Sequence, residues 1–344
     1  MAQSLTMTRP DDWHVHFRQG DALLDVVHHT ARCFGRALVM PNLTPPVTTV
    51  AQALQYRQEI ISASPLVAFE PLMTLYLTDD TPVEEVWRAK ESGIVHAVKL
   101  YPRGATTNSV SGVTDLSRLY PVLAEMERVG LVLSIHGEAT APADPFDAER
   151  LFVDETLTSL VKSFPGLKIV LEHVTTAEAV DFVQSASPRV AATITAHHLR
   201  YSRADLFDGG IRPHLFCRPV LKRAIPHRQA VLAAATSGSP KFFLGTDSAP
   251  HPLQAKESTC GCAGCYSAPC ALELYAEVFE AAGMLDRLEG FASFHGADFY
   301  GVPRNADTVT LVRQPWIVRP MLEFGAVTVR PLCAGETLIW RIAE

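Results

Sequence analysis

The sequence predicts an α/β fold, a (β/α)8 TIM barrel with a C-terminal extension packed on the barrel. Short apolar runs recur along the chain, and longer segments with helical spacing separate them. Most of these runs are continuously apolar, which is typical of parallel strands that are buried on both faces. There are eight such runs, and eight strands that alternate with helices favour a closed barrel.

The expected strands cover residues 12–16, 37–41, 68–76, 96–101, 131–136, 168–173, 189–195 and 241–247. Helix-like segments lie between them at 50–61, 82–91, 116–129, 148–163 and 176–185. The pairs Thr81-Pro82 and Thr175-Thr176 mark two of the helix starts. The main alternative is an open doubly wound sheet, but the turn at 17–21 lacks the glycine-rich pattern of nucleotide-binding sheets.

The tail at 308–342 has shorter apolar runs and turns rich in Pro and Gly. We expect it to pack outside the barrel, so that residues 1–344 form a single domain.

Composition limits the possible functions. The chain has 344 residues, of which 47% are hydrophobic and 19% charged, as in a globular enzyme. The net charge of −7 argues against general nucleic-acid binding, which needs a basic face. No apolar run approaches the roughly 20 residues that cross a bilayer, and the first residues do not resemble a secretion signal. We therefore expect no membrane partner.

The seven cysteines are an odd number, which favours a reduced, cytoplasmic protein. Cys260, Cys262 and Cys265 form a cluster whose spacing is poor for a tetrahedral structural zinc site. A glycine-rich loop with reduced thiols is the favoured interpretation, and a structural zinc protein built on this cluster is the alternative.

Several possible metal ligands lie on or at the ends of the expected strands. His14 and His16 are two residues apart in the first strand, so strand alternation puts both side chains on one face. The C-terminal ends of the strands form the active-site face of TIM-barrel enzymes, so five strands deliver polar groups to one mouth. Apart from His251, we expect ordinary surface or packing roles for the other histidines. The candidate ligands are His14, His16, Lys99, His136, His173 and Asp247.

Lys99 has two interpretations. A protonated ammonium would repel metal ions, but burial lowers the pKa of a lysine, and a neutral amine can react with carbon dioxide to give a carbamate. The carbamate could bridge two metals. Alternatively, Lys99 pairs with a carboxylate such as that of Asp247.

The ordered set of motifs resembles the amidohydrolase superfamily, and within it the shorter, bacterial monofunctional dihydroorotase family. The resemblance runs from the first strand to about Pro303. It is carried by the segments at 9–18, 40–46, 99–102, 105–108, 136–138, 171–176, 212–217, 245–251 and 256–265.

The resemblance implies two Zn²⁺ ions bridged by N6-carboxylated Lys99 and a hydroxide. It assigns His14, His16 and Asp247 to the more buried ion and His136 and His173 to the other. Asp247 is also the expected catalytic proton carrier. The implied reaction is the reversible interconversion of N-carbamoyl-L-aspartate and L-dihydroorotate in pyrimidine biosynthesis, and the implied assembly is a homodimer.

The resemblance also implies substrate contacts. Arg18, Asn42 and His251 would hold the substrate carboxylate, and the backbone at Arg218 and Ala263 would contact the ring amide. Thr106 and Thr107 would form the tip of a mobile loop that closes on substrate. His136 is expected to contact substrate as well. The substrate-binding set is therefore Arg18, Asn42, Thr106, Thr107, His136, Arg218, His251 and Ala263.

The sequence departs from the family pattern at two places. Arg218 stands where an apolar residue is expected, and a side chain turned inward there would change the wall of the ring site. Ala196-His197-His198 replaces a Pro-Gln-His-like stretch. The rival functions are a dihydropyrimidinase or hydantoinase, whose typical substrates lack the ring carboxylate, and a catalytically silent scaffold.

Overall fold

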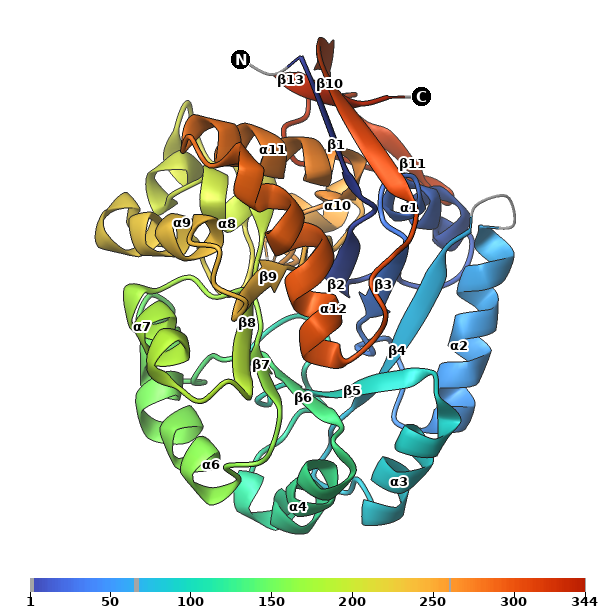
Figure 1. The fold of residues 1–344 in the computed structure, drawn as a ribbon, viewed down its shortest axis with the longest axis vertical. Coiled ribbons are helices and arrows are strands. Elements are labelled where there is room, and N and C mark those ends of the chain that lie inside the picture. Colours follow the sequence, from blue (N-terminus) through green and yellow to red (C-terminus); the bar gives the residue numbers. More distant parts are fainter. Residues whose placement is uncertain (1–2, 65–67, 260, 344) are drawn as a thin grey trace.

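The chain folds around an eight-stranded parallel sheet in which strands follow one another in sequence order (Figure 1). A computed structural model describes residues 3–64, 68–259 and 261–343. The barrel strands are β2 (Asp11–Val15), β3 (Arg36–Val39), β4 (Glu70–Tyr76), β5 (Val95–Leu100), β6 (Val132–Ile135), β7 (Ile169–Leu171), β8 (Val190–Ile194) and β9 (Phe242–Leu244).

The barrel closes between its first and last strands just beyond the end of β9. The backbone N–H of Asp247 donates to the carbonyl of His14 at 2.8 Å, and that of His16 donates to Ser248 at 3.0 Å. The buried carboxylate of Asp12 adds bonds from the backbone and hydroxyl of Thr246. The predicted TIM barrel is confirmed.

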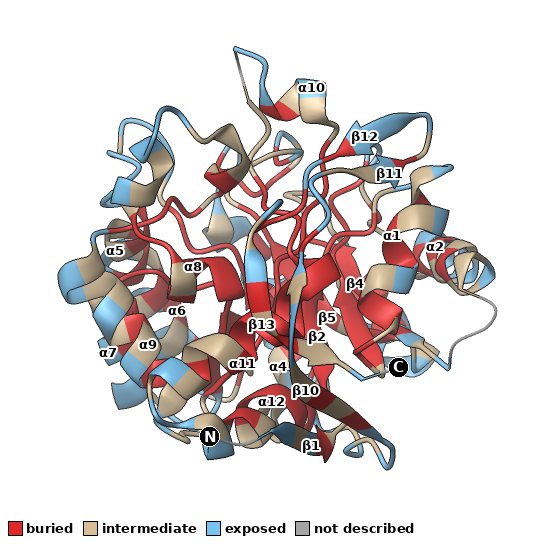
Figure 2. Ribbon diagram, turned by 90° about the horizontal axis from the view of Figure 1, so that it is seen from above, coloured by how far each residue is buried: buried red, intermediate tan, exposed pale blue. Residues whose placement is uncertain are grey.

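Helices surround the strands (Figure 1), and the outer faces of α2, α7 and α9 carry the exposed residues (Figure 2). The longer helices are α1 (Ala22–Ala31), α2 (Val50–Ala63), α3 (Val83–Ser92), α4 (Tyr120–Val129), α7 (Ala177–Ser185), α9 (Gln229–Thr236) and α11 (Ala271–Ala281). The shorter ones include α5 (Ala148–Phe152), α6 (Thr158–Ser163), α8 (Ala196–Arg200), α10 (Leu253–Lys256) and α12 (His295–Tyr300). Among the described residues, every helix is too short or too polar to cross a bilayer.

Helix starts follow local capping chemistry. Thr49 and Gln52 form a capping box at the start of α2. The hydroxyl of Thr176 accepts the Ala179 N–H at the start of α7, and Pro82 precedes α3. Both marked starts are therefore found within one residue of the prediction.

The core has two parts. Side chains inside the barrel, such as Leu72, Val170 and Phe243, form one cluster, and a larger cluster fills the layer between strands and helices. Helix α12 closes one end of the barrel, where Tyr300 stacks on Trp13 with ring centroids 4.4 Å apart. Gly296 is required there, since a Cβ would lie 2.0 Å from the Trp13 indole nitrogen.

The tail lies outside the barrel, as predicted. Strands β10 (Thr308–Ile317) and β13 (Thr337–Ile342) join β1 (Ser4–Thr8) in an antiparallel sheet, and β11 (Leu322–Phe324) pairs with β12 (Val327–Val329). Figure 1 shows both termini in this region. β1 was not predicted from the sequence.

Several strands end earlier than predicted. His136, His173 and Asp247 were expected as the last residues of their strands, but they follow β6, β7 and β9. His173 and Asp247 have positive φ values of 43° and 45°, so the backbone has already left the extended conformation. This turn directs both side chains into the mouth.

Candidate active site

The six predicted ligand residues gather at one end of the barrel. His14, His16, His136, His173 and Asp247 line a single cavity. Lys99 lies just behind its wall, fully buried in β5, with its Nζ 5.2 Å from the centroid of the cavity-lining Tyr101 ring. Side chains distant in sequence therefore meet at the C-terminal ends of the strands.

The histidines and the aspartate form one packed group. The Asp247 Oδ1 lies 3.3 Å from His14 Nε2 and 3.1 Å from His16 Nε2. Ring centroids of His14 and His173 are 5.1 Å apart, and those of His136 and His173 are 4.9 Å apart. The ligand atoms of His14, His16 and Asp247 lie within 4.8 Å of one another, close enough to share one ion after small shifts.

Several buried polar atoms in this group have no hydrogen-bond partner within the described part of the chain. They are His14 Nε2, His16 Nδ1, His173 Nδ1 and Lys99 Nζ. Unpaired buried polar groups are costly, so such a concentration in one place indicates a missing ligand. Imidazole and carboxylate donors in this set suit zinc and similar divalent ions.

Three buried carboxylates that support the ligands were missed by sequence reasoning. Glu172 Oε2 lies 2.9 Å from His14 Nδ1 and fixes that ring, as carboxylates beside metal-binding histidines do. Glu138 Oε2 lies 2.7 Å from His136 Nε2. Asp12 accepts the His14 backbone N–H. Their only signal in the sequence is an acidic residue within two positions of a candidate histidine.

Burial is the largest cause of the shifted pKa values in this site. It lowers the pKa of His14, and it lowers those of His16 and His173 well below the usual value. Burial raises the pKa of Asp247, against the pull of His14 and Lys99. The histidines are therefore neutral, as metal binding requires.

The Lys99 amine is partly neutral near physiological pH. Burial lowers its pKa to about 8, although Glu172 and Asp247 act in the opposite direction. Among the described residues no carboxylate is hydrogen-bonded to it, so Lys99 does not form the direct ion pair with Asp247 that was the alternative interpretation.

A cationic side chain stands beside the cluster. Arg18 lines the cavity, and its Nε donates to the Pro250 carbonyl at 3.0 Å. Its Nη2 lies 2.9 Å from His251 Nε2, which is also 3.0 Å from the Ala263 carbonyl. These contacts fix the guanidinium at the edge of the cavity, with donors left to bind an anion.

The loop that carries Thr106 and Thr107 is closed over the cavity. Thr107 Oγ1 accepts the Ala263 N–H at 3.2 Å and lies 3.4 Å from its carbonyl. Asn42 donates to the Thr107 carbonyl, and Asn108 donates to that of Asn42. The enclosed space is only about 20 Å³, room for roughly one water, so the loop must move before a larger molecule enters.

The Arg218 side chain turns inward. It lines the cavity and its Nε donates to Glu138 Oε2 at 3.0 Å, where that oxygen also contacts His136. The charge of Arg218 balances the fully buried Glu138 carboxylate. The cavity wall thus contains a guanidinium where an apolar side chain was expected.

The cysteine-rich loop contributes two described thiols, and the three-thiol site considered from the sequence would also need Cys260. Cys262 and Cys265 are free thiols, whereas Cys260 lies outside the described residues. Cys265 instead faces His197 and Cys217.

Comparison with known proteins gives a family for this chain. A family model described as the amidohydrolase family matches residues 12–319. A curated dihydroorotase from Nitrosococcus oceani is 59% identical over 346 residues, covering 100% of both chains. A curated dihydroorotase from Shewanella amazonensis is 61% identical over 341 residues, covering 99% of both.

Solved structures show the same likeness. A dihydroorotase from Campylobacter jejuni shares 33% identity with a TM-score of 0.92, over 100% of this chain and 98% of that one. A dihydroorotase from Saccharomyces cerevisiae, in complex with 5-fluoroorotic acid, shares 34% identity with a TM-score of 0.90, over 99% of both. An L-hydantoinase from Arthrobacter aurescens has a TM-score of 0.81 at 16% identity, over 98% of this chain and 83% of that one, a likeness of fold alone.

Proposed function

This chain belongs to the amidohydrolase family and, within it, to the dihydroorotases, and we propose that its barrel-mouth cavity interconverts N-carbamoyl-L-aspartate and L-dihydroorotate. It is a cyclic amidohydrolase of pyrimidine biosynthesis. One observation carries the assignment of the reaction to this cavity. A fixed guanidinium, that of Arg18, lines the same closed space as a cluster of buried histidines and Asp247. This pairing suits a substrate that has both an amide and a carboxylate.

The family is metal-dependent, and we assign the metals to the residues of the mouth. His14, His16 and Asp247 would hold one Zn²⁺, and His136 and His173 the other. The unpartnered nitrogens of His14, His16 and His173 fit this assignment. With carboxylated Lys99 and a hydroxide as bridging ligands, the ions would supply an ionised water and a polarised carbonyl.

Lys99 acquires its ligand oxygens by reaction with carbon dioxide. The neutral amine attacks the carbon, an N–C bond forms, and one proton leaves to solvent. The lowered pKa supplies the neutral amine, and burial away from bulk water protects the product.

Asp247 carries the proton in our proposal. Its Oδ1 lies against His14 and His16, and its pKa is raised by burial, so the carboxylate accepts a proton more readily than an exposed one does. In hydrolysis it takes a proton from the attacking water and delivers it to the leaving ring nitrogen. In ring closure the same carboxylate moves the proton in the opposite direction.

The substrate carboxylate would bind Arg18, Asn42 and His251. Arg18 offers a planar, charged donor, and the buried Asn42 Oδ1 has no hydrogen-bond partner among the described residues. The backbone of Arg218 and Ala263 would contact the ring amide, and His136 would contact the substrate. The loop with Thr106 and Thr107 would open for entry and then close to exclude water.

We also propose a single domain, a homodimer and a cytoplasmic location. The antiparallel pairing of β1 with β10 supports the single domain, because it joins the two ends of the chain. The described cysteines are free, which fits a reducing compartment.

The decisive experiment measures metal content and hydrolysis of L-dihydroorotate by the same purified preparation. We expect hydrolysis that is lost on chelation and restored by Zn²⁺. Dihydrouracil, which lacks the ring carboxylate, is the matched control. Equal turnover of dihydrouracil would favour the dihydropyrimidinase alternative, and an inactive, fully metallated protein would favour the silent scaffold.

A further inference from the structure

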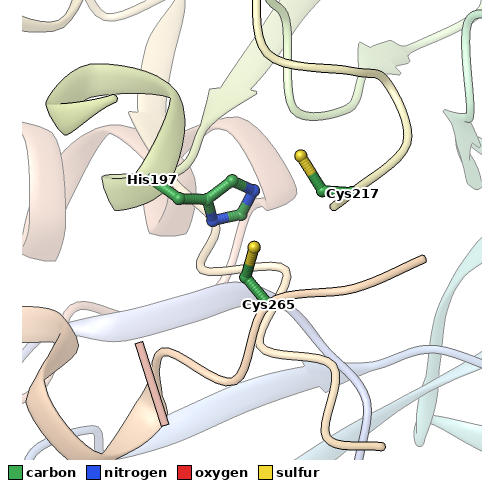
Figure 3. A group of neighbouring side chains, drawn as sticks. All are labelled: His197, Cys217 and Cys265. Atoms are coloured by element: carbon green, nitrogen blue, oxygen red, sulfur yellow. The ribbon is translucent and has the colours of Figure 1, made fainter. Parts of the chain in front are cut away.

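A second group of possible metal ligands lies outside the residues assigned to the reaction. It contains His197 from α8 and two cysteines, Cys217 and Cys265, from separate loops. All three side chains are buried, and their ligand atoms lie within 4.8 Å of one another. Figure 3 shows the His197 imidazole with the thiols of Cys217 and Cys265 close beside it.

His197 is the most unusual member of this group. The residue is fully buried, and neither Nδ1 nor Nε2 has a hydrogen-bond partner among the described residues. Leaving even one buried polar group unpaired costs roughly 1–3 kcal/mol. The next residue, His198, is also buried but bonds to Thr195 and to the Pro219 carbonyl. A bond from His197 to a metal would satisfy one of these two nitrogens.

The two thiols are available as ligands. Cys217 Sγ lies 3.3 Å from the Pro219 carbonyl and 3.6 Å from His198 Nε2, and its thiol also interacts with that of Cys265. Cys265 Sγ lies 3.5 Å from the His214 carbonyl. Both cysteines are free thiols, and a bound divalent ion would displace their protons, although the neighbouring Cys265 thiol and burial raise the pKa of Cys217 without an ion.

A buried cation stands next to the thiols. Lys256 Nζ donates to the carbonyls of Phe216, Cys262 and Gly264 at 2.7–2.8 Å. Two of these residues immediately precede Cys217 and Cys265. The Lys256 ammonium opposes the burial that raises the pKa of Cys217. Two thiolates would neutralise a divalent ion, so Lys256 would not repel it.

We propose that His197, Cys217 and Cys265 bind one Zn²⁺ ion as a structural site separate from the barrel-mouth centre. Two sulfurs and one imidazole are ligands that zinc prefers, and donors around one zinc lie about 3.5–4 Å apart. The observed spacing needs an inward shift of less than about 1 Å to reach this geometry. Binding releases both thiol protons to solvent.

The location gives the ion a role. The residue after Cys217 is Arg218, and Ala263 stands two residues before Cys265; both line the reaction cavity. An ion shared with α8 would brace these two loops against the barrel. His197, Cys217 and Cys265 are thus positioning residues, which hold cavity-lining backbone without touching substrate.

The test begins with the wild-type protein loaded with Co²⁺ in place of Zn²⁺. Thiolate ligation gives a sulfur-to-cobalt charge-transfer absorption in the near ultraviolet, which histidine, carboxylate and carbamate ligands do not. We expect this absorption in the wild type, and one more equivalent of bound metal per chain than in His197→Gln. Its absence from cobalt-loaded wild type would overturn the proposal, whatever the behaviour of any variant.

Variants identify the ligands. His197→Gln, Cys217→Ser and Cys265→Ser should each weaken or abolish the absorption. Cys262→Ser, in the same loop, and Cys33→Ser, at a buried thiol beside α1, should leave it unchanged. An absorption that survives Cys217→Ser but disappears in Cys262→Ser would assign the metal to the loop thiols and refute the site proposed here.

Discussion

At the scale of single residues, Lys99 differs from an ordinary buried lysine. Its amine is fully buried without a hydrogen-bond partner in the described chain, and burial lowers its pKa to about 8. A lysine kept as a structural cation would be paired with a carboxylate, so the surroundings favour chemistry at the nitrogen.

We predict that Lys99→Ala lowers kcat for dihydroorotate hydrolysis by more than about 100-fold, because the ligand between the metals is lost. A short-chain carboxylic acid should restore part of the activity by supplying the missing oxygens. Lys162→Ala, at an exposed lysine of α6, is the control. Full activity of Lys99→Ala without added acid would refute the carbamate.

Arg18 is proposed to bind the substrate carboxylate and to take no part in the reaction step. Its guanidinium is fixed by Pro250 and His251. We predict that Arg18→Ala raises KM by about 10- to 100-fold, the equivalent of losing charge-assisted hydrogen bonds worth ~1.5–3 kcal/mol. Steady-state kinetics with Arg118→Ala, at an exposed position, gives the comparison. An unchanged KM would remove Arg18 from the carboxylate site.

At the scale of elements, the loop at 105–109 closes the cavity through few contacts. The hydroxyl of Thr107 makes the direct bonds to Ala263 on the opposite side. We predict that Thr107→Val keeps the shape but lowers kcat/KM by roughly thirtyfold, because two bonds of ~1 kcal/mol each that favour the closed loop are lost. Hydrogen exchange of this loop should become faster in the variant. Val110→Ala, at a side chain that is 79% exposed, should change neither quantity.

The parallel strands could be predicted from the sequence because strands that are buried on both faces have continuous apolar runs. All eight lie within a few residues of their expected positions. Strand β1 could not be predicted. Its five residues, Ser4–Thr8, are short and partly exposed, and they are held by pairing with Thr308–Val312 at the other end of the chain.

Site residues that lie at the C-terminal ends of the strands could be predicted from the sequence. Glu138 and Glu172 were missed because an acidic residue beside a histidine has no distinctive spacing, and only the fold shows which ring it contacts. The inward turn of Arg218 depends on Glu138, which is 80 residues away. The His197, Cys217 and Cys265 group likewise joins segments that no local spacing relates.

At the scale of the whole molecule, buried histidines link stability to pH. Burial lowers the pKa of several of them, and that of His29, bonded to Tyr266, falls to about 3 from an ordinary 6.5. The unfolded chain therefore binds the proton first. The stabilisation is complete above about pH 6.5 and is lost progressively as the pH falls toward about 3.

We predict that His29→Gln makes the metal-free protein less sensitive to acid. Between about pH 7.5 and about pH 5.5, the variant should lose ~1 kcal/mol less free energy of unfolding than the wild type. Urea titrations at both pH values measure this difference. His28→Gln, at the exposed neighbour in α1, should behave as the wild type does. Parallel losses in all three proteins would show that His29 does not contribute.

The backbone hydrogen bonds between β2 and the segment after β9 affect when the site can form during synthesis of the protein. His14 and His16 leave the ribosome early, but Asp247 and the Ser248 backbone that complete their surroundings emerge more than two hundred residues later. During most of translation, His14 and His16 are therefore present without the other residues of the site. Stable capture of ions at the mouth must follow release of nearly the whole nascent chain, so cofactor loading is a late, post-assembly event.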